Sequence, residues 1–160
     1  MDNNFDKIYE KYGEMLYRIA FVYLGNASDT EDVLQEVFIT YLYNPPEFKN
    51  EEHKKAWLIR AVQCRCINLL KKTSRKSVCL EDLQLTAPDN DKDKKLDVIK
   101  AVIALAPKYK SPLLLYYYND YSVEEIAKIL KITKSAVKMR LKRGREILKI
   151  QLEDYNYEEK

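Results

Sequence analysis

The side chains whose spacing points to chemistry are cations near the end of the chain, and the chemistry they indicate is phosphate binding. Residues 134–149 carry seven Lys or Arg and a single acid, Glu146, so their net charge is +6, whereas the whole chain has +3. At about 100° per residue, one side of a helix formed by this segment is apolar and the opposite side is cationic and polar. The apolar side holds Val137, Leu141, Gly144 and Leu148, and the other holds Ser135, Lys138, Met139, Lys142 and Arg143, with Lys134 at the start.

A helix with a free cationic side fits the major groove of DNA, where first-turn side chains reach base edges and later cations bind phosphates. The alternative is a core helix whose basic side is merely solvated. The preceding residues favour DNA binding. Ser122 and Glu125 fit a capping box that begins a helix, and residues 131–133 form a short turn in which Thr133 caps the next helix. These features predict a helix-turn-helix.

Residues typical of catalysis are scarce. The chain has one histidine, His53, only three glycines and no Gly-rich phosphate loop, so we expect neither an enzyme nor a cofactor. Cys64, Cys66 and Cys79 are an odd number, as in a reducing compartment, and their spacing with His53 fits no standard zinc site. Without a signal peptide or a bilayer-length apolar run, the protein is expected in the cytoplasm, with no membrane insertion.

Composition and periodicity predict an all-α protein, since 160 residues with 46% hydrophobic and 33% charged content include few helix breakers. A first helix spans Phe5 to Tyr23 at helical spacing and ends at Gly25. A second begins at Asp29, where Ser28 and Glu31 fit another capping box, and stops before the breaker at residues 44–46. Its predicted buried stripe is Leu34, Val37, Phe38 and Tyr41.

The outward side of this second helix is acidic and amide-bearing, with Asp32, Gln35 and Glu36 at i, i+3 and i+4. Such a stripe is either a binding surface or an ordinary solvated face. Periodicity alone leaves both interpretations open.

A third helix is expected over residues 51–72, with Trp57, Ala61, Cys64 and Ile67 or Asn68 recurring along it. Residues 49–76 carry nine cations against two acids, a net charge of +7, and these cations include Lys71 and Lys72. Basic residues interleaved with Phe48 and Trp57 suggest contact with an unpaired strand, because aromatic rings stack on bases while cations follow phosphates. Trp57 taken alone is more often a core anchor, because large aromatic residues dominate small cores.

The chain is expected to form two small helical domains joined by a flexible linker at residues 73–95, where periodicity lapses and polar residues prevail. The domains would span residues 1–72 and 96–152. Before the helix-turn-helix pair, the second domain would have a helix over residues 96–106, stopped at Pro107, and another beginning at Pro112, making four helices. Residues 153–160 form a tail that we expect to fray.

Three ordered segments resemble the extracytoplasmic-function (ECF) group of bacterial RNA polymerase sigma factors. Residues 29–42, DTEDVLQEVFITYL, are similar to the D-x-x-Q-E-x-F signature of the family's region 2, and residues 56–72, AWLIRAVQCRCINLLKK, to its W-L-x-R-I-A-R-N helix. Residues 105–148 resemble its region 4. The resemblance covers nearly the whole chain and implies a non-enzymatic subunit that directs core polymerase to promoters, recognises two promoter elements and aids strand opening.

The resemblance also implies roles for individual residues. The polymerase clamp would be bound by Asp32, Gln35 and Glu36. The melted downstream promoter element would be bound by the loop at residues 43–50 and by the family-matched Arg60, Gln63, Cys64 and Arg65. The duplex upstream element would be bound by Lys138, Met139, Lys142 and Arg143. Cys64 stands where the family commonly has Asn, and Gly144 replaces the usual Ala, which costs the helix up to about 1 kcal/mol.

Expected partners are therefore core RNA polymerase and promoter DNA, and regulation would come from an anti-sigma factor or from transcriptional control. One alternative is a stand-alone helix-turn-helix regulator whose N-terminal domain binds a ligand or dimerises. Another is an interaction module that binds polymerase without reading DNA, which the cationic face of residues 134–148 disfavours.

Overall fold

The computed structural model describes the backbone of residues 2–72 and 89–158, and within these ranges every regular element is a helix. The all-α prediction is therefore confirmed. The chain divides into two compact units, Met1–Leu80 and Glu81–Lys160. The linker was predicted at residues 73–95, and residues 73–88 of it lie outside the described residues.

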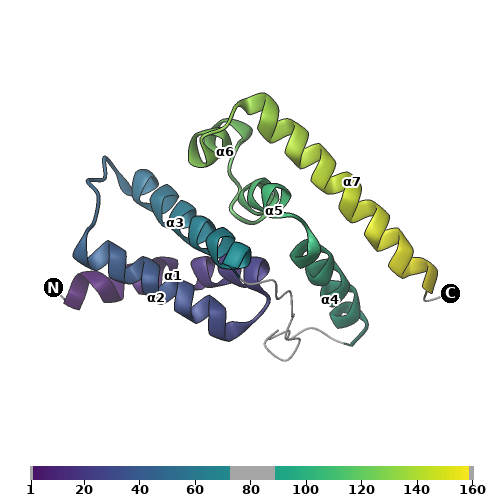
Figure 1. Cartoon of the computed structure of the whole chain (residues 1–160), viewed down its shortest axis with the longest axis horizontal. Coiled ribbons are helices and arrows are strands. Elements are labelled where there is room, and N and C mark those ends of the chain that lie inside the picture. Colours follow the sequence, from purple (N-terminus) through teal and green to yellow (C-terminus); the bar gives the residue numbers. More distant parts are fainter. Residues whose placement is uncertain (1, 73–88, 159–160) are drawn as a thin grey trace. The chain divides into compact units, whose positions relative to one another are not determined.

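The N-terminal unit is a three-helix bundle of α1 (Asp2–Leu24), α2 (Ala27–Tyr43) and α3 (Glu51–Lys72), in which α1 packs against both other helices (Figure 1). Its core contains fully buried aliphatic side chains from all three helices, including Leu16, Ile19, Val37, Leu58, Ile59 and Val62. The predicted stop after α1 is confirmed, because Gly25 adopts φ 76° and its N–H donates to Phe21 O at 2.7 Å.

The predicted start of α2 was wrong by two residues. The capping residue is Asn26, whose side-chain oxygen accepts from Asp29 N at 2.8 Å, and Asn26 Nδ2 donates to the Asp29 carboxylate at 2.9 Å. Asn26 thus satisfies the Asp29 N–H, a donor of the first turn, and α2 begins before the Ser28–Glu31 capping box. The predicted end is confirmed, since α2 stops at Tyr43, just before the Pro-Pro sequence.

The predicted bounds of α3 are confirmed. The residues that α3 buries are Leu58, Ile59, Val62, Gln63 and Cys66. Cys64 and Asn68 are exposed, while Trp57 and Ala61 are half-buried. Helix α3 therefore packs on α1 and α2 through its bulkier aliphatic residues rather than through Ala61 and Cys64.

The C-terminal unit contains α4 (Asp89–Ala104), α5 (Pro107–Leu113), a π-helical turn η2 (Leu114–Tyr118), α6 (Val123–Leu130) and α7 (Lys134–Glu158). Helices α4, α5 and α6 all pack against α7. Three predicted bounds were wrong. Helix α4 begins at Asp89, seven residues earlier than the predicted Leu96. Helix α5 begins at Pro107 rather than at Pro112, because proline suits a first helical turn. Helix α7 continues beyond Leu152 into the predicted tail.

Candidate nucleic-acid interface

The turn between α6 and α7 is built as the sequence predicts. Ser122 Oγ accepts from Glu125 N at 3.1 Å and donates to the Glu125 carboxylate at 3.2 Å, which caps α6. Lys131 adopts a left-handed φ of 55° and its N–H donates to Ala127 O, which ends α6 sharply. Thr133 Oγ1 then accepts from Ala136 N at 3.1 Å and caps α7. The two helices form a helix-turn-helix.

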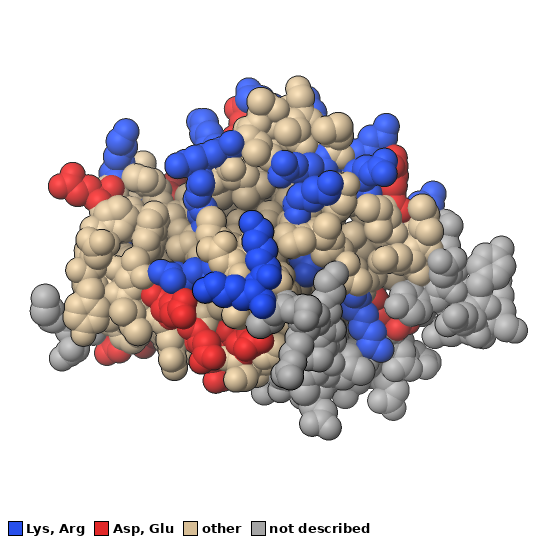
Figure 2. Space-filling view, viewed as in Figure 1, with Lys and Arg blue, Asp and Glu red and all other residues tan. Residues whose placement is uncertain are grey.

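Helix α7 has the two opposed sides that the sequence predicts. Val137, Leu141 and Gly144 are buried and Leu148 is half-buried. All the predicted outward residues are exposed, namely Ser135, Lys138, Met139, Lys142 and Arg143, with Met139 at 65%. Lys134 is also exposed and pairs with Glu124 of α6 at 2.7 Å. Lys and Arg side chains cover much of the visible surface of α7 (Figure 2).

Two tyrosines of the C-terminal unit lie beside arginines of α7. Burial would raise the pKa of Tyr109, but hydrogen bonds from Lys108 and Arg143 outweigh it and lower that pKa. Tyr117, in η2, accepts a hydrogen bond at its hydroxyl from Arg145 Nη1 at 3.0 Å. Arg143 and Arg145 are therefore each held near an aromatic side chain.

In the N-terminal unit, the predicted polymerase-binding residues Asp32, Gln35 and Glu36 are all exposed on α2. Acidic side chains gather over this helix in Figure 2. Glu36 Oε2 accepts from Arg65 Nη1 at 3.1 Å, and Arg65 Nη2 also donates to Thr40 Oγ1 at 2.7 Å. A residue expected to bind polymerase is thus paired with one expected to bind DNA.

Sequence reasoning missed an apolar groove of about 430 Å³ between α1 and α2. Its lining includes Gln35 and a set of large apolar side chains, among them Phe5, Tyr9, Phe38, Ile39 and Leu42. Tyr9, Ile39 and Leu42 are exposed. The available signal was that Ile39 and Leu42 are large apolar residues outside the predicted buried stripe of α2.

The predicted downstream-element residues of α3 occupy different environments. Cys64, Lys71 and Lys72 are exposed, while Arg60 and Arg65 are half-buried. Gln63 is only 2% exposed, and neither its side-chain oxygen nor its nitrogen has a hydrogen-bond partner. The Gln63 side chain therefore does not reach the surface in this conformation.

The loop before α3 is organised by aromatic contacts. The half-buried Phe48 ring stacks on Tyr41 with centroids 6.1 Å apart and meets Trp57 and His53 edge-on at 5.8 and 5.6 Å. Asn50 Oδ1 accepts from His53 N at 2.8 Å at the start of α3. Trp57 thus belongs to a half-buried cluster at the surface of the unit.

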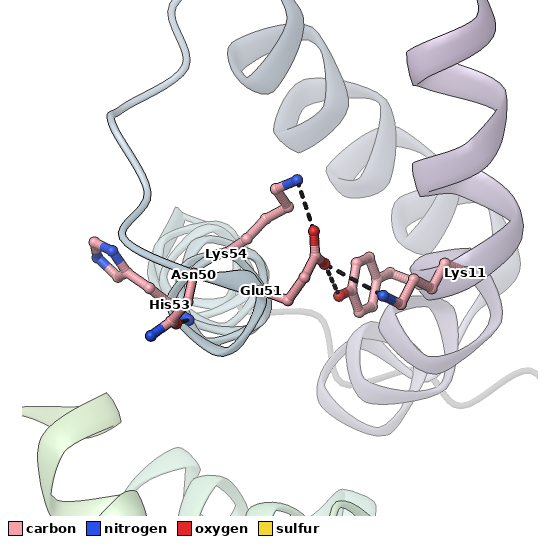
Figure 3. Close-up of polar contacts among 6 residues, drawn as sticks. Lys11, Asn50, Glu51, His53 and Lys54 are labelled. Carbon is pink, nitrogen blue, oxygen red and sulfur yellow. Dashed lines mark hydrogen bonds and ion pairs between the residues drawn. The ribbon is translucent and has the colours of Figure 1, made fainter.

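Glu51 ties the start of α3 to α1. Its carboxylate accepts from Tyr12 Oη at 2.8 Å, Lys54 Nζ at 3.1 Å and Lys11 Nζ at 3.3 Å (Figure 3). These hydrogen bonds, Tyr12 first, lower the pKa of Glu51 to about 2. The basic helix α3 is therefore fixed to the bundle at the end that follows the aromatic loop.

In the described part of the chain, no helix has the length and apolar content needed to cross a membrane. Similarities to known proteins agree with the two units. The Sigma-70 region 2 family matches residues 8–76, and the Sigma-70, region 4 family matches residues 95–148.

Two relatives from Bacillus subtilis match along most of the chain. RNA polymerase sigma factor SigV is 31% identical over 140 residues, covering 85% of this chain and 83% of the relative. ECF RNA polymerase sigma factor SigX is 26% identical, covering 96% of this chain and 86% of the relative.

Solved structures share the fold. The sigma factor RpoE of Bartonella quintana, solved with the anti-sigma factor NepR, aligns with a TM-score of 0.77 at 19% identity over 94% of this chain and 97% of that one. CnrH, solved with the cytosolic domain of CnrY, aligns with a TM-score of 0.70 at 19% identity, over 96% of this chain and 90% of that one. Neither the two family matches nor the two Bacillus subtilis relatives favour a stand-alone helix-turn-helix regulator. The chain belongs to the RNA polymerase sigma factors of the ECF group.

Proposed function

We propose that the two units divide the work of a sigma factor. The N-terminal unit binds core polymerase through α2 and the melted downstream promoter element through α3. The C-terminal unit binds the duplex upstream element through α7. The observation that supports this division is the exposed side of each helix, which is acidic on α2 and cationic on α7. We place this function in the cytoplasm and assign the protein no catalytic step.

Polymerase docking is proposed for a surface that combines Asp32, Gln35 and Glu36 with the neighbouring apolar groove. Gln35 belongs to both features. Exposed apolar side chains grouped beside polar ones are typical of protein interfaces. Tyr9 and Ile39 are each 54% exposed, so a partner could bury considerable apolar area there.

Downstream-element binding is proposed for the exposed and half-buried residues around the start and outer side of α3. These are Phe48, Trp57, Arg60, Cys64, Arg65, Lys71 and Lys72. The half-buried aromatic cluster offers ring faces and edges against which an unstacked base could pack. Gln63 is left out of this surface because its side chain is buried, and we propose that it acts within the bundle.

Regulation by an anti-sigma factor is proposed because the structural neighbour RpoE was solved with the anti-sigma factor NepR. The neighbour CnrH was likewise solved with a partner, the cytosolic domain of CnrY. The apolar groove between α1 and α2 is the surface of this chain that an inhibitory helix would cover. Binding there would compete with polymerase for Gln35.

The test is transcription by sigma-free bacterial core polymerase supplied with this chain and a randomised promoter library. We expect transcripts that begin at defined start sites on a subset of templates. The double variant Asp32→Ala/Gln35→Ala should weaken core binding by roughly thirtyfold, since each exposed contact contributes about 1 kcal/mol. Glu10→Ala, which removes an exposed acid of α1, is the control. Absence of start-site-specific transcripts from every template would refute the proposal.

A further inference from the structure

The π-helical turn η2 places three consecutive tyrosines on the surface of the C-terminal unit. Tyr116, Tyr117 and Tyr118 are 38%, 56% and 38% exposed. A π-helical turn is rare and frequently marks a functional site. This turn exposes three tyrosine side chains side by side in the sequence.

The middle tyrosine contacts α7. Arg145 Nη1 donates to the Tyr117 hydroxyl at 3.0 Å, and both residues are exposed. Because the hydroxyl oxygen acts as an acceptor in this contact, its own proton remains available for donation. The Tyr116 ring meets the Tyr117 ring edge-on with centroids 4.9 Å apart, which limits the rotation of Tyr117.

Arg145 lies on a line of cations along α7. At about 100° per residue, Lys138, Lys142, Arg145 and Lys149 fall within a sector of about 60°, along one edge of the outward side. Arg145 is seven residues after Lys138, so it lies about 10 Å further along the helix axis. The major groove is about 12 Å wide, so a helix that places Lys138 at the bases brings Arg145 to the level of the backbone.

We propose that Arg145 and Tyr117 together bind one phosphate of the upstream promoter element, outside the surface that reads its bases. This inference rests on the proposed function, in which α7 occupies the major groove. The guanidinium supplies the positive charge and further N–H donors, and the Tyr117 hydroxyl donates its remaining proton to a phosphate oxygen. Arginine and tyrosine are both common phosphate ligands in protein–DNA interfaces.

A phosphate contact and a purely structural contact make different predictions. A phosphate contact contributes equally to every DNA sequence and releases about one counterion, so it changes the salt dependence of binding. A contact that only joins η2 to α7 changes the stability of the unit and leaves the salt dependence unaltered. The salt dependence is therefore the diagnostic measurement.

The experiment uses holoenzyme assembled from core polymerase and full-length chain, bound to a labelled promoter selected from the randomised library over a range of salt concentrations. We expect Arg145→Gln to weaken binding about tenfold and Tyr117→Phe about threefold. Arg145→Gln should also lower the slope of log affinity against log salt by about 0.9. The losses should be the same on promoters altered in the upstream element.

Tyr116→Phe is the matched control, because it removes a hydroxyl from the same turn without touching the contact with Arg145, and it should bind as wild type. The promoter affinity of the double variant Tyr117→Phe/Arg145→Gln should lie within about twofold of that of Arg145→Gln alone, since the two groups hold one phosphate. An unchanged salt slope for Arg145→Gln, or wild-type binding by Tyr117→Phe, overturns the proposal. Weakened association with core polymerase would instead assign the tyrosines to a protein interface, and also overturns it.

A further variant separates failure of this proposal from failure of the proposed function. If Lys138→Glu/Arg143→Glu loses promoter binding while Arg145→Gln does not, α7 reads DNA without the phosphate site. If Lys138→Glu/Arg143→Glu binds as wild type, α7 does not read the upstream element and both proposals fall.

Discussion

Helices α3 and α7 both carry an excess of cations, yet they are anchored in their units in different ways. Helix α7 buries a narrow side through Val137 and Leu141, and its outward cations are exposed. Helix α3 buries a broader side, and Arg65 is half-buried and paired with Glu36 of α2. Helix α7 therefore keeps its packing residues apart from its candidate DNA-binding residues, whereas α3 has both kinds on neighbouring positions.

This difference affects how substitutions should be interpreted. On α7, a change to an exposed cation should alter DNA binding and leave the fold intact, because surface substitutions rarely shift stability by more than about 0.5 kcal/mol. On α3, a change to Arg65 removes an ion pair and a hydrogen bond within the bundle as well as a candidate DNA contact. Binding measurements on α3 variants therefore require a parallel measurement of stability.

The largest effect is expected from the buried side of α3. Ile59→Ala removes a fully buried side chain and should lower the free energy of unfolding by about 2–5 kcal/mol. Cys64→Ala should change it by less than about 0.5 kcal/mol because Cys64 is exposed. Chemical denaturation of the two variants measures both values. Equal losses would contradict the observed orientation of α3.

The next largest effect concerns the outward side of α7. Lys138→Glu/Arg143→Glu should weaken binding of holoenzyme to the upstream element by about 2 kcal/mol or more, roughly thirtyfold, because two cations become repulsive to phosphates. Equilibrium binding to a selected promoter measures the loss. Lys7→Glu/Lys100→Glu changes the net charge equally at cations outside α3 and α7 and should bind nearly as wild type. A similar loss in both variants would indicate a non-specific effect of charge.

How well the sequence predicted these helices depended on how the apolar residues are distributed. In α7 they recur on one side between charged residues, so both faces and the Ser122 cap of the preceding helix were predictable. In α3, apolar residues occur on most sides, and periodicity could not distinguish the Leu58 and Ile59 side from the Ala61 and Cys64 side. Only packing against α1 and α2 decides between them.

Other differences arose where two local signals competed. Asn26 and Ser28 could each cap α2, and the asparagine does so through a reciprocal contact with Asp29. Pro107 and Pro112 could each begin α5, and the earlier proline does. The groove between α1 and α2 was not predictable, because its shape depends on how two helices fit together. The roles of the proposed site residues stay predictions.

A smaller effect is expected at Gly144, where α7 crosses α5. Gly144→Ala gains about 1 kcal/mol of helix propensity, but its new Cβ would lie 2.8 Å from Leu113 Cδ1. Moving the buried Leu113 costs about 1–3 kcal/mol, so we expect a net loss of about 1 kcal/mol in the free energy of unfolding. In a Leu113→Val background the same substitution should be stabilising, because the clashing methyl group is withdrawn. Destabilisation in both backgrounds would refute this explanation.

The smallest effect is expected at Glu51, which joins α3 to α1. Its pKa is lowered from 4.5 to about 2, so its contribution to stability is complete above pH 4.5 and is lost as the pH falls towards 2. Glu51→Gln should therefore lower the Tm slightly at pH 7, because this carboxylate is exposed to solvent.

The difference in Tm between wild type and Glu51→Gln should shrink as the pH is lowered from 4.5 to 2. Thermal unfolding at several pH values measures it, with Glu47→Gln, in the preceding loop, as the matched control. A difference that stays constant across this range would mean that the charge of Glu51 contributes nothing. The start of α3 would then be held by the aromatic contacts of Phe48 and by the Asn50 cap.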